Sequence, residues 1–207
     1  MKNHCHLIFL LLCLQFPLTV FGQFGLEIFQ SRWAGFYGYY FQPSTGYELS
    51  LSLKRDDWNE RFGVSVGVID MIPAQDDFPV ITSSSRTANI ISYQQVSIGG
   101  FGEFGILPHK FSGAFSPFWG LEAKLIEAFY DIQGFTTPNR VASSLNGLET
   151  GIKLGASLKL AEGSIWIQSG LGRNFVIVQN VLEDQYIDRA GYTSYWKPFV
   201  SVCLFVF

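Results

Sequence analysis

The sequence predicts an all-β protein, a closed eight-stranded antiparallel up-and-down transmembrane β-barrel. Three observations support this fold class: segments in which apolar and polar residues alternate, connections that are short and long in turn, and a last apolar segment that runs to the terminal Phe207. Successive side chains of a strand point to opposite faces of a sheet. A period of two therefore separates a lipid-facing set of residues from an inward-facing set.

The alternation is clearest in three segments. From Tyr47 to Lys54 the odd positions are apolar and the even ones polar, and from Phe62 to Val68 the even positions are apolar and the odd ones are Gly or Ser. From Leu148 to Leu160 the even positions are Leu, Thr, Ile, Leu, Ala, Leu and Leu. Eight segments are predicted as strands, most of them about as long as the roughly 9–11 residues that cross a bilayer: 24–34, 46–55, 61–70, 89–104, 114–130, 147–160, 164–178 and 192–207.

The connections between these segments fall into two classes. Three are short, namely 56–60, 105–113 and 161–163, and four are longer, namely 35–45, 71–88, 131–146 and 179–191. Membrane barrels have short turns on the periplasmic side and longer loops outside. The sorting therefore predicts that both chain ends lie on the periplasmic side.

Aromatic residues fall near both ends of the predicted strands, where aromatic belts meet the two membrane interfaces. The alternative is an ordinary aromatic core in a soluble β-protein. On the side of the termini the predicted belt contains Phe24, Trp58, Phe62, Phe104, Trp119 and Phe207. On the opposite side it contains Trp33, Phe36, Tyr37, Tyr130, Tyr195 and Trp196.

The chain begins with the features of a secretory signal peptide. A weakly basic start precedes an apolar stretch from Leu7 to Phe21, and small residues precede a predicted cleavage site before Gln23. An uncleaved anchor is the alternative, although the stretch is short for a spanning helix and contains a proline. We therefore expect a cleaved signal peptide over residues 1–22 and a barrel domain over residues 23–207. Cleavage leaves Cys203 as the one cysteine, so no internal disulfide is expected.

The last segment resembles the C-terminal assembly signal of bacterial outer-membrane barrels, in which Phe199, Phe205 and Phe207 share one face of the final strand. The whole mature chain is similar in outline to the small eight-stranded barrels of the OmpA, OmpX and OmpW groups and to the outer-membrane β-barrel proteins of Bacteroidota. The resemblance implies a Gram-negative outer-membrane location, contact with membrane lipid and lipopolysaccharide, and insertion by the barrel assembly machinery through the last strand. Nucleic acid is not an expected partner, since the net charge is −3.

An eight-stranded barrel has an interior that its own side chains can fill. Buried charges must be paired, so a ladder of Glu–Lys pairs that plugs the lumen is expected. The alternative is a selective or gated ion path through the same charges. The predicted inward set is Glu48, Lys54, Glu122, Lys124, Glu149, Lys153 and Lys159, with Glu27 and Glu103 as additions.

The sequence predicts no catalytic, cofactor-binding or metal site. Outside the signal segment His109 is the one histidine, and it lies in a turn on the predicted periplasmic side, where it cannot act as a base on the outer leaflet. The predicted function is a non-enzymatic envelope-structural or surface-interaction role. The alternative is a narrow solute channel or a barrel associated with a secretion machinery.

Two further features concern the outer surface. Arg32 and Arg173 interrupt the apolar face near the outer ends of their strands. Either they reach lipopolysaccharide phosphates, or they mark where those strands leave the membrane. The loops 71–88 and 131–146 are candidate contact surfaces, and a long strand that projects past the bilayer would offer an edge for β-augmentation.

Overall fold

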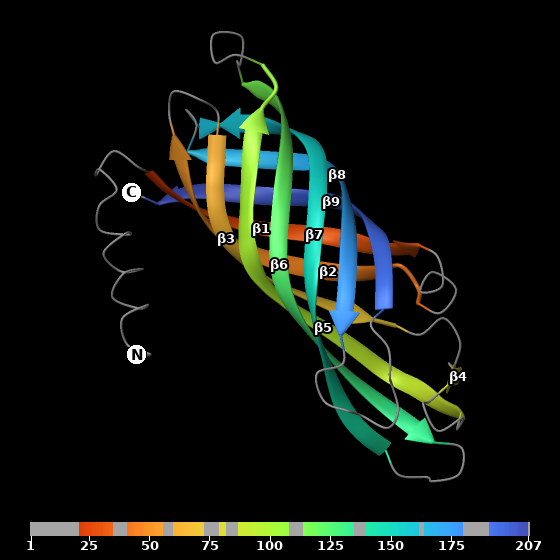
Figure 1. Ribbon diagram of the computed structural model, residues 1–207. Helices are drawn as coiled ribbons and strands as arrows, with labels where there is room; N and C mark the ends of the chain where they lie inside the picture. The colour runs from red at the N-terminus through yellow and green to blue at the C-terminus, as the bar shows by residue number, and fades with distance from the viewer. Residues whose placement is uncertain are drawn as a thin grey trace, which may run out of the picture.

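The computed structural model describes residues 21–34, 41–55, 60–72, 79–81, 87–107, 114–134, 140–161, 164–179 and 191–206. These residues form strands (Figure 1): β1 (Phe21–Ala34), β2 (Ser44–Arg55), β3 (Glu60–Met71), β4 (Pro79–Ile81), β5 (Thr87–Gly105), β6 (Phe115–Gly134), β7 (Arg140–Leu160), β8 (Ile165–Gln179) and β9 (Gly191–Val206). Among the described residues, no helix has the length and hydropathy needed to cross a membrane. The expected signal peptide lies outside this part of the chain, except for Phe21 and Gly22, which begin β1.

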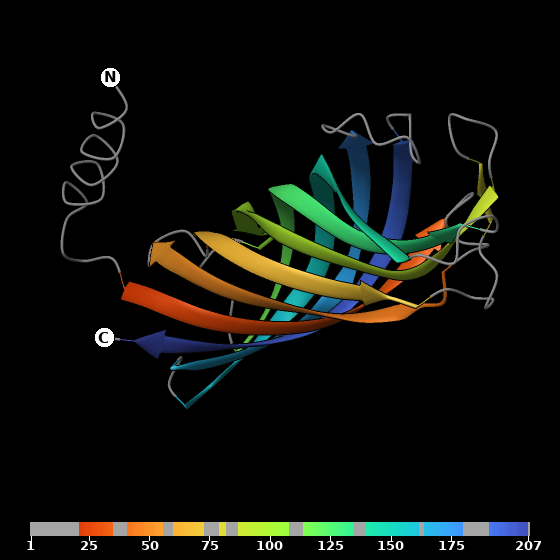
Figure 2. The ribbon, with the colours of Figure 1, turned by 90° about the horizontal axis from the view of Figure 1, so that it is seen from below.

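The strands form one antiparallel sheet that closes on itself (Figures 1 and 2). Its order is β3-β2-β1-β9-β8-β7-β6-β5-β4, and β3 also pairs with β5 from Arg61↔Glu103 to Met71↔Tyr93. Each of the eight long strands therefore has a neighbour on both sides, which satisfies the backbone groups of the wall without water. The prediction of a closed eight-stranded barrel is confirmed; β4 is a three-residue addition that pairs with the start of β5.

The prediction of a loop over residues 131–146 is wrong for most of these residues, which belong to strands. β6 continues to Gly134 and β7 already begins at Arg140, with Gln133↔Arg140 as the outermost pair. Extending the hairpin gives these backbone groups partners that a long loop would leave to solvent. β7 pairs with β8 only from Asn146 onward, so residues 140–145 pair with β6 alone in the part of the chain described (Figure 1).

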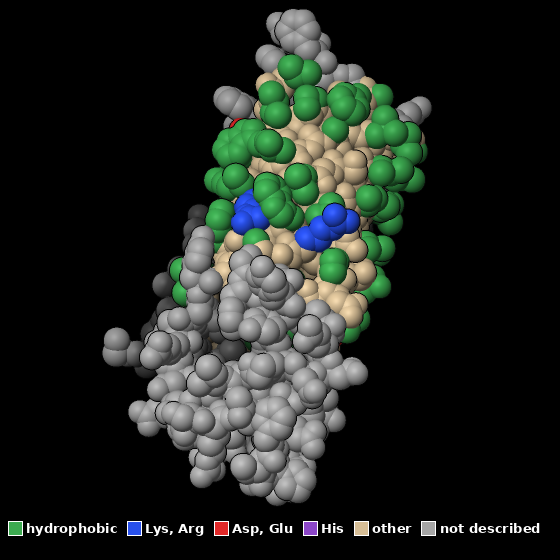
Figure 3. Space-filling view, turned by 90° about the vertical axis from the view of Figure 1, so that its right-hand side faces the viewer, with side chains coloured by type: hydrophobic (Ala, Val, Ile, Leu, Met, Phe, Trp, Pro, Cys, Tyr) green, Lys and Arg blue, Asp and Glu red, His purple; other side chains and the backbone are tan. Residues whose placement is uncertain are grey.

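The outside of the wall is covered by large apolar side chains (Figure 3). On β2 alone, Tyr47, Leu49, Leu51 and Leu53 are between 41% and 58% exposed. An apolar surface that continues around a barrel is stable against hydrocarbon, not against water. The barrel is therefore a transmembrane one. Other strands contribute Phe24, Leu26, Ile28, Val64, Val66, Ile98, Leu121, Leu125, Ile152, Leu154, Leu171, Val200, Val202 and Leu204.

The predicted aromatic belts are only partly on this outer surface. Near the end that holds the termini, Phe62 meets Phe104 edge to face at 5.4 Å between ring centroids, and Phe104 stacks on Trp119 at 4.6 Å. At the opposite end Trp196 is exposed as predicted. The placement of Tyr195 in the outer belt is wrong, because its side chain faces the lumen and is buried. The reason is the period of two, which places Tyr195 on the other face from Trp196. Phe24 is exposed and Trp33 is half-buried. The remaining predicted belt residues lie outside the described part of the chain, namely Phe36, Tyr37, Trp58, Phe207 and the side chain of Tyr130.

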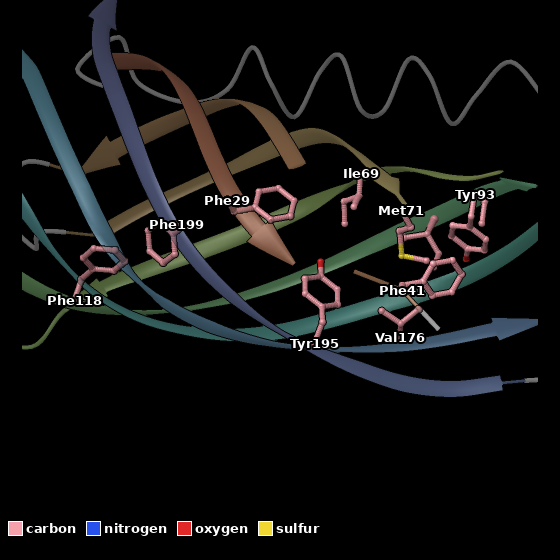
Figure 4. Packing of buried hydrophobic residues seen from close by; sticks show 11 residues of the cluster. Phe29, Phe41, Ile69, Met71, Tyr93, Phe118, Val176, Tyr195 and Phe199 are labelled. Carbon is pink, nitrogen blue, oxygen red and sulfur yellow. The ribbon is translucent and has the colours of Figure 1, made fainter. Parts of the chain in front are cut away.

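Inside the barrel, buried apolar side chains form one cluster that extends along its length (Figure 4). Phe118 and Phe199 lie at one end of the cluster, and Phe41, Met71 and Tyr93 lie at the other, toward the loops. Its further members include Phe29, Ile69 and Val176. Charged side chains occupy the lumen beside this cluster.

Gly46 on β2 leaves the room that the Phe29 ring occupies. The two residues are register partners across β1 and β2, and a Cβ at Gly46 would overlap the Phe29 ring. The ring in turn lies 4.4 Å from the Lys197 ammonium. The absence of a side chain at this position thus sets the position of both neighbours.

We expect Gly46→Val to destabilise the barrel by about 1–3 kcal/mol, because the added side chain must displace Phe29. The matched control is Gly100→Val, since a Cβ at Gly100 meets nothing closer than the Gly63 carbonyl oxygen at 3.6 Å. Thermal unfolding followed by the difference in gel mobility between unheated and boiled samples measures both. Equal unfolding temperatures for the two variants would contradict the packing argument.

Candidate functional site: an ion-pair network in the barrel lumen

The charged side chains of the lumen come from alternate positions of their strands. Each strand places one face toward the interior, so residues two apart, such as Glu122 and Lys124 on β6, lie side by side. All members are buried, with at most 7% of their surface exposed. The network comprises the carboxylates Glu27, Glu48, Glu103, Glu122 and Glu149 and the cations Arg61, Lys124, Lys153 and Lys197.

Two lysines hold the centre of the network. Lys197 Nζ lies 2.7 Å from Glu27, 2.9 Å from Glu48 and 3.6 Å from Glu122. Lys124 Nζ lies 2.6 Å from the same Glu48 oxygen, 3.0 Å from Glu122 and 4.0 Å from Glu149. Two ammonium groups therefore share two carboxylates, which brings β1, β2, β6 and β9 together across the lumen.

Toward the end of the barrel that holds the chain termini, the network continues through Glu103. This carboxylate lies 2.7 Å from Lys153 Nζ and 2.9 Å from Arg61 Nη2, and it accepts a hydrogen bond from Gln168 at 3.0 Å. Lys153 also lies 3.8 Å from Glu27, which links this group to the centre. Cys203 is buried beside Arg61, with Sγ 2.7 Å from Nη1.

Glu149 ends the network on the side of the loops, where its partners are mostly neutral. It accepts hydrogen bonds from Asn174 Nδ2 at 2.6 Å, Tyr195 Oη at 2.9 Å and Gln95 Nε2 at 2.9 Å. Asn174 also donates to Glu122. These neutral donors supplement the ammonium group of Lys124, which lies 4.0 Å from this buried carboxylate.

Aromatic rings pack against the cations and fill the space around them. Lys153 Nζ lies 5.2 Å from the centroid of Phe101 and 5.4 Å from that of Phe199, and Arg61 lies 4.9 Å from Phe101. Cation–π contacts of this kind gain strength where water is excluded. A cavity of about 10 Å³ remains beside Arg61, room for about one water molecule.

Five of the predicted lumen residues meet in this network: Glu48, Glu122, Lys124, Glu149 and Lys153. Lys159 is half-buried on β7, and its Nζ lies 4.9 Å from the Trp166 ring centroid. The Lys54 side chain lies outside the described part, although its backbone pairs with Arg61. Glu27 and Glu103, the two predicted additions, are both members.

The sequence-based prediction missed Lys197 and Arg61. The signal for Lys197 was available, because it is two residues from Phe199 and shares its face of β9. Phe199 itself lies in the lumen, 6.4 Å from Phe118, and Phe205 is half-buried against Trp166 at 5.6 Å, while Phe207 is outside the described residues. The even positions of β9 from Trp196 to Leu204 form its lipid-facing side instead.

Comparison with known proteins agrees with this architecture. No protein-family model and no curated protein sequence matches the chain. Among solved structures, Neisserial surface protein A is similar over 88% of this chain and 96% of its own, with a TM-score of 0.62 and 12% sequence identity. The chain has the fold of a small outer-membrane β-barrel. The prediction of a barrel of the outer-membrane kind is thereby confirmed.

Two further solved structures are similar with lower TM-scores. The attachment invasion locus protein Ail of Yersinia pestis has 13% identity and a TM-score of 0.46, with 90% of this chain and 97% of that chain covered. A major outer membrane protein from Thermus thermophilus has 11% identity and a TM-score of 0.47, with 89% and 99% covered. Among the residues described in this chain, no group of three or more His, Cys, Asp and Glu is placed to hold a metal ion.

We expect Lys197→Met to destabilise the barrel by about 3–5 kcal/mol, because it leaves buried carboxylates without their shared cation. Adding Glu27→Gln should restore part of this loss, since it removes one of the uncompensated charges. Urea unfolding in lipid vesicles measures the free energies. Glu127→Gln is the control, because Glu127 is exposed on the outer face of β6; a Lys197→Met protein as stable as this control would contradict the prediction.

Proposed function

We propose that this protein is a non-enzymatic outer-membrane barrel with a plugged lumen and a role in surface interaction or envelope structure. The observation that carries the proposal is the ion-pair network. Its charged members come from β1, β2, β3, β5, β6, β7 and β9, and β8 joins through Gln168 and Asn174.

A network of this kind opposes ion passage. A hydrated ion would have to separate Lys197 and Lys124 from the carboxylates that they share, and separating one buried charge from its partner costs about 3–5 kcal/mol. The phenyl rings beside the cations, such as Phe29 beside Lys197, further narrow the path. The same contacts stabilise the closed lumen and exclude solute from it.

We expect the wild-type protein to give no stepwise conductance in planar lipid bilayers, since the paired charges block the lumen. A general porin reconstituted in the same bilayer is the positive control. Conductance steps from the wild-type protein that change in size with Glu122→Gln or Lys153→Met would contradict the plug and support the alternative, a narrow solute channel.

The surface role is supported by the projecting hairpin of β6 and β7. Residues 140–145 of β7 pair with β6 on one side, and their second side has no strand partner in the part of the chain described. An unpaired strand edge is a template for an added strand. We therefore propose that an extended segment of a partner protein pairs with this edge by β-augmentation.

We expect replacement of residues 131–142 by Asn-Gly to abolish surface binding while the barrel persists. The two-residue turn would close the hairpin at the Tyr130↔Ser143 pair and remove the outermost pairs of the projecting strands. Adhesion of cells that display the protein is the readout, and retained heat-dependent gel mobility is the folding control. Unchanged adhesion with this shortened hairpin would count against the edge as the contact surface.

Export and assembly complete the proposal. Residues 1–22 act as a cleaved signal peptide, and the last strand, with Phe199, Phe205 and Phe207, is the segment that the barrel assembly machinery recognises. Membrane lipid and lipopolysaccharide surround the apolar exterior.

A further inference from the structure

Two arginines and a tryptophan form a row across three neighbouring strands on the outer face of the wall. Trp196 on β9 is the register partner of Arg32 on β1 and of Arg173 on β8. Trp196 is 47% exposed, Arg32 is exposed and Arg173 is half-buried. Figure 3 shows basic side chains at the border between the apolar belt and the loop end of the barrel.

Neither guanidinium is neutralised by a carboxylate of the described residues. Arg173 lies 4.6 Å from the Trp196 ring and donates from Nη2 to Ser194 Oγ at 2.7 Å. Arg32 donates from Nε to Gln30 Oε1 at 2.9 Å. An arginine has five N–H donors, so each retains donors for an external acceptor. The neutral contacts hold the two groups in place without cancelling their charge.

The row lies at the depth of a lipid headgroup. Trp196 is ten residues from Val206, the periplasmic end of β9. At about 3.4 Å per residue and a tilt of about 40°, this corresponds to about 26 Å, the height of the apolar band of such barrels. Tryptophan also favours this interface. By this measure the row stands close to the outer-leaflet border, and on β8 the exposed Ile177 lies beyond it toward the loops.

Below the row, the same strands offer an aliphatic surface. Ile28 pairs with Val200 and Leu26 pairs with Val202, and all four side chains are exposed on the lipid-facing side of β1 and β9. A lipid whose headgroup reached Arg32 would lay its acyl chains along this strip. The outer face thus places a polar subsite for a headgroup directly above an apolar subsite for acyl chains, as in a lipid molecule.

The opposite side of the barrel carries the other sign. Asp70 on β3 and Glu127 on β6 are exposed, and the neighbour of Asp70 is the neutral Gln94, which donates to it at 2.6 Å. Among the described side chains, those on the outer face of β8 and β1 therefore attract an anion, and those of β3 and β6 repel it. This difference in charge between the described faces favours the side of β8, β9 and β1 for an anionic lipid.

We infer that Arg32, Trp196 and Arg173 form a docking site for the phosphorylated headgroup of an outer-leaflet lipid. The guanidinium groups hold phosphate oxygens by paired N–H···O contacts, a geometry that arginine provides and lysine does not. The site is independent of the lumen and of the β7 edge, so it goes beyond the function proposed above.

The test is native mass spectrometry of the full barrel in a maltoside detergent, which carries no phosphate. Lipid A, or lipid A from which both phosphates have been removed, is titrated into the wild type, into Arg32→Gln/Arg173→Gln and into Asp70→Asn/Glu127→Gln. We expect the wild type to retain phosphorylated lipid A in preference to the dephosphorylated form. We expect apparent affinity to fall about fivefold for each arginine removed, and to be kept in the acidic-side variant.

Equal retention of the two lipids by the wild type would overturn the inference, and so would a double-arginine variant that binds lipid A as the wild type does. Arg32→Lys/Arg173→Lys is the second variant, because it keeps the charge but lacks the planar fork; an intermediate loss supports paired contacts. The comparison of the two lipids uses the wild-type protein alone, so the inference can fail even where a variant does not fold.

Discussion

The absence of water in a bilayer is the constraint on which this structure depends. Each backbone N–H and C=O in the wall must find a partner within the protein, and an open sheet would leave two edges unpaired. The pairing of β1 with β9 and of β3 with β5 removes those edges. With eight strands in the wall, the enclosed space is narrow enough for side chains to fill, and its contents follow from that size.

The lumen resolves a second constraint, the cost of burying charge. Among the described residues, five carboxylates and four cations are buried in it, and each isolated charge would be strongly destabilising. Sharing is the solution: Lys197 and Lys124 both contact Glu48 and Glu122, and Glu103 is contacted by Lys153 and Arg61. Neutral donors complete the coordination of Glu149, where the cations are fewer.

Sequence pattern predicted the barrel because the period of two is a local property of each strand. It also identified Glu48, Lys124 and Lys153 as inward-facing, since each lies at a polar position of its strand, between neighbours that belong to the apolar face. It failed at Lys197 and Tyr195, where Trp196, Pro198 and Phe199 stand close together and apolar residues occur on both faces of β9. Which cation meets which carboxylate depends on the relative stagger of strands that are far apart in the sequence. Lys197 and Glu48, for example, are 149 positions apart. The stagger is a property of the whole barrel and cannot be predicted from any one segment.

The position of Lys197 on the last strand has a consequence for the order in which the barrel forms. Glu27 and Glu48 belong to the first two strands, and the ammonium group closest to Glu27 arrives only with β9. Until that strand docks, Glu27 has only the more distant Lys153 as a cation among the described residues, and Glu48 has Lys124 alone. Closure of the wall and completion of the ion pairing are therefore one event, and a chain truncated before β9 lacks a cation that the carboxylates of its first two strands need when they are buried.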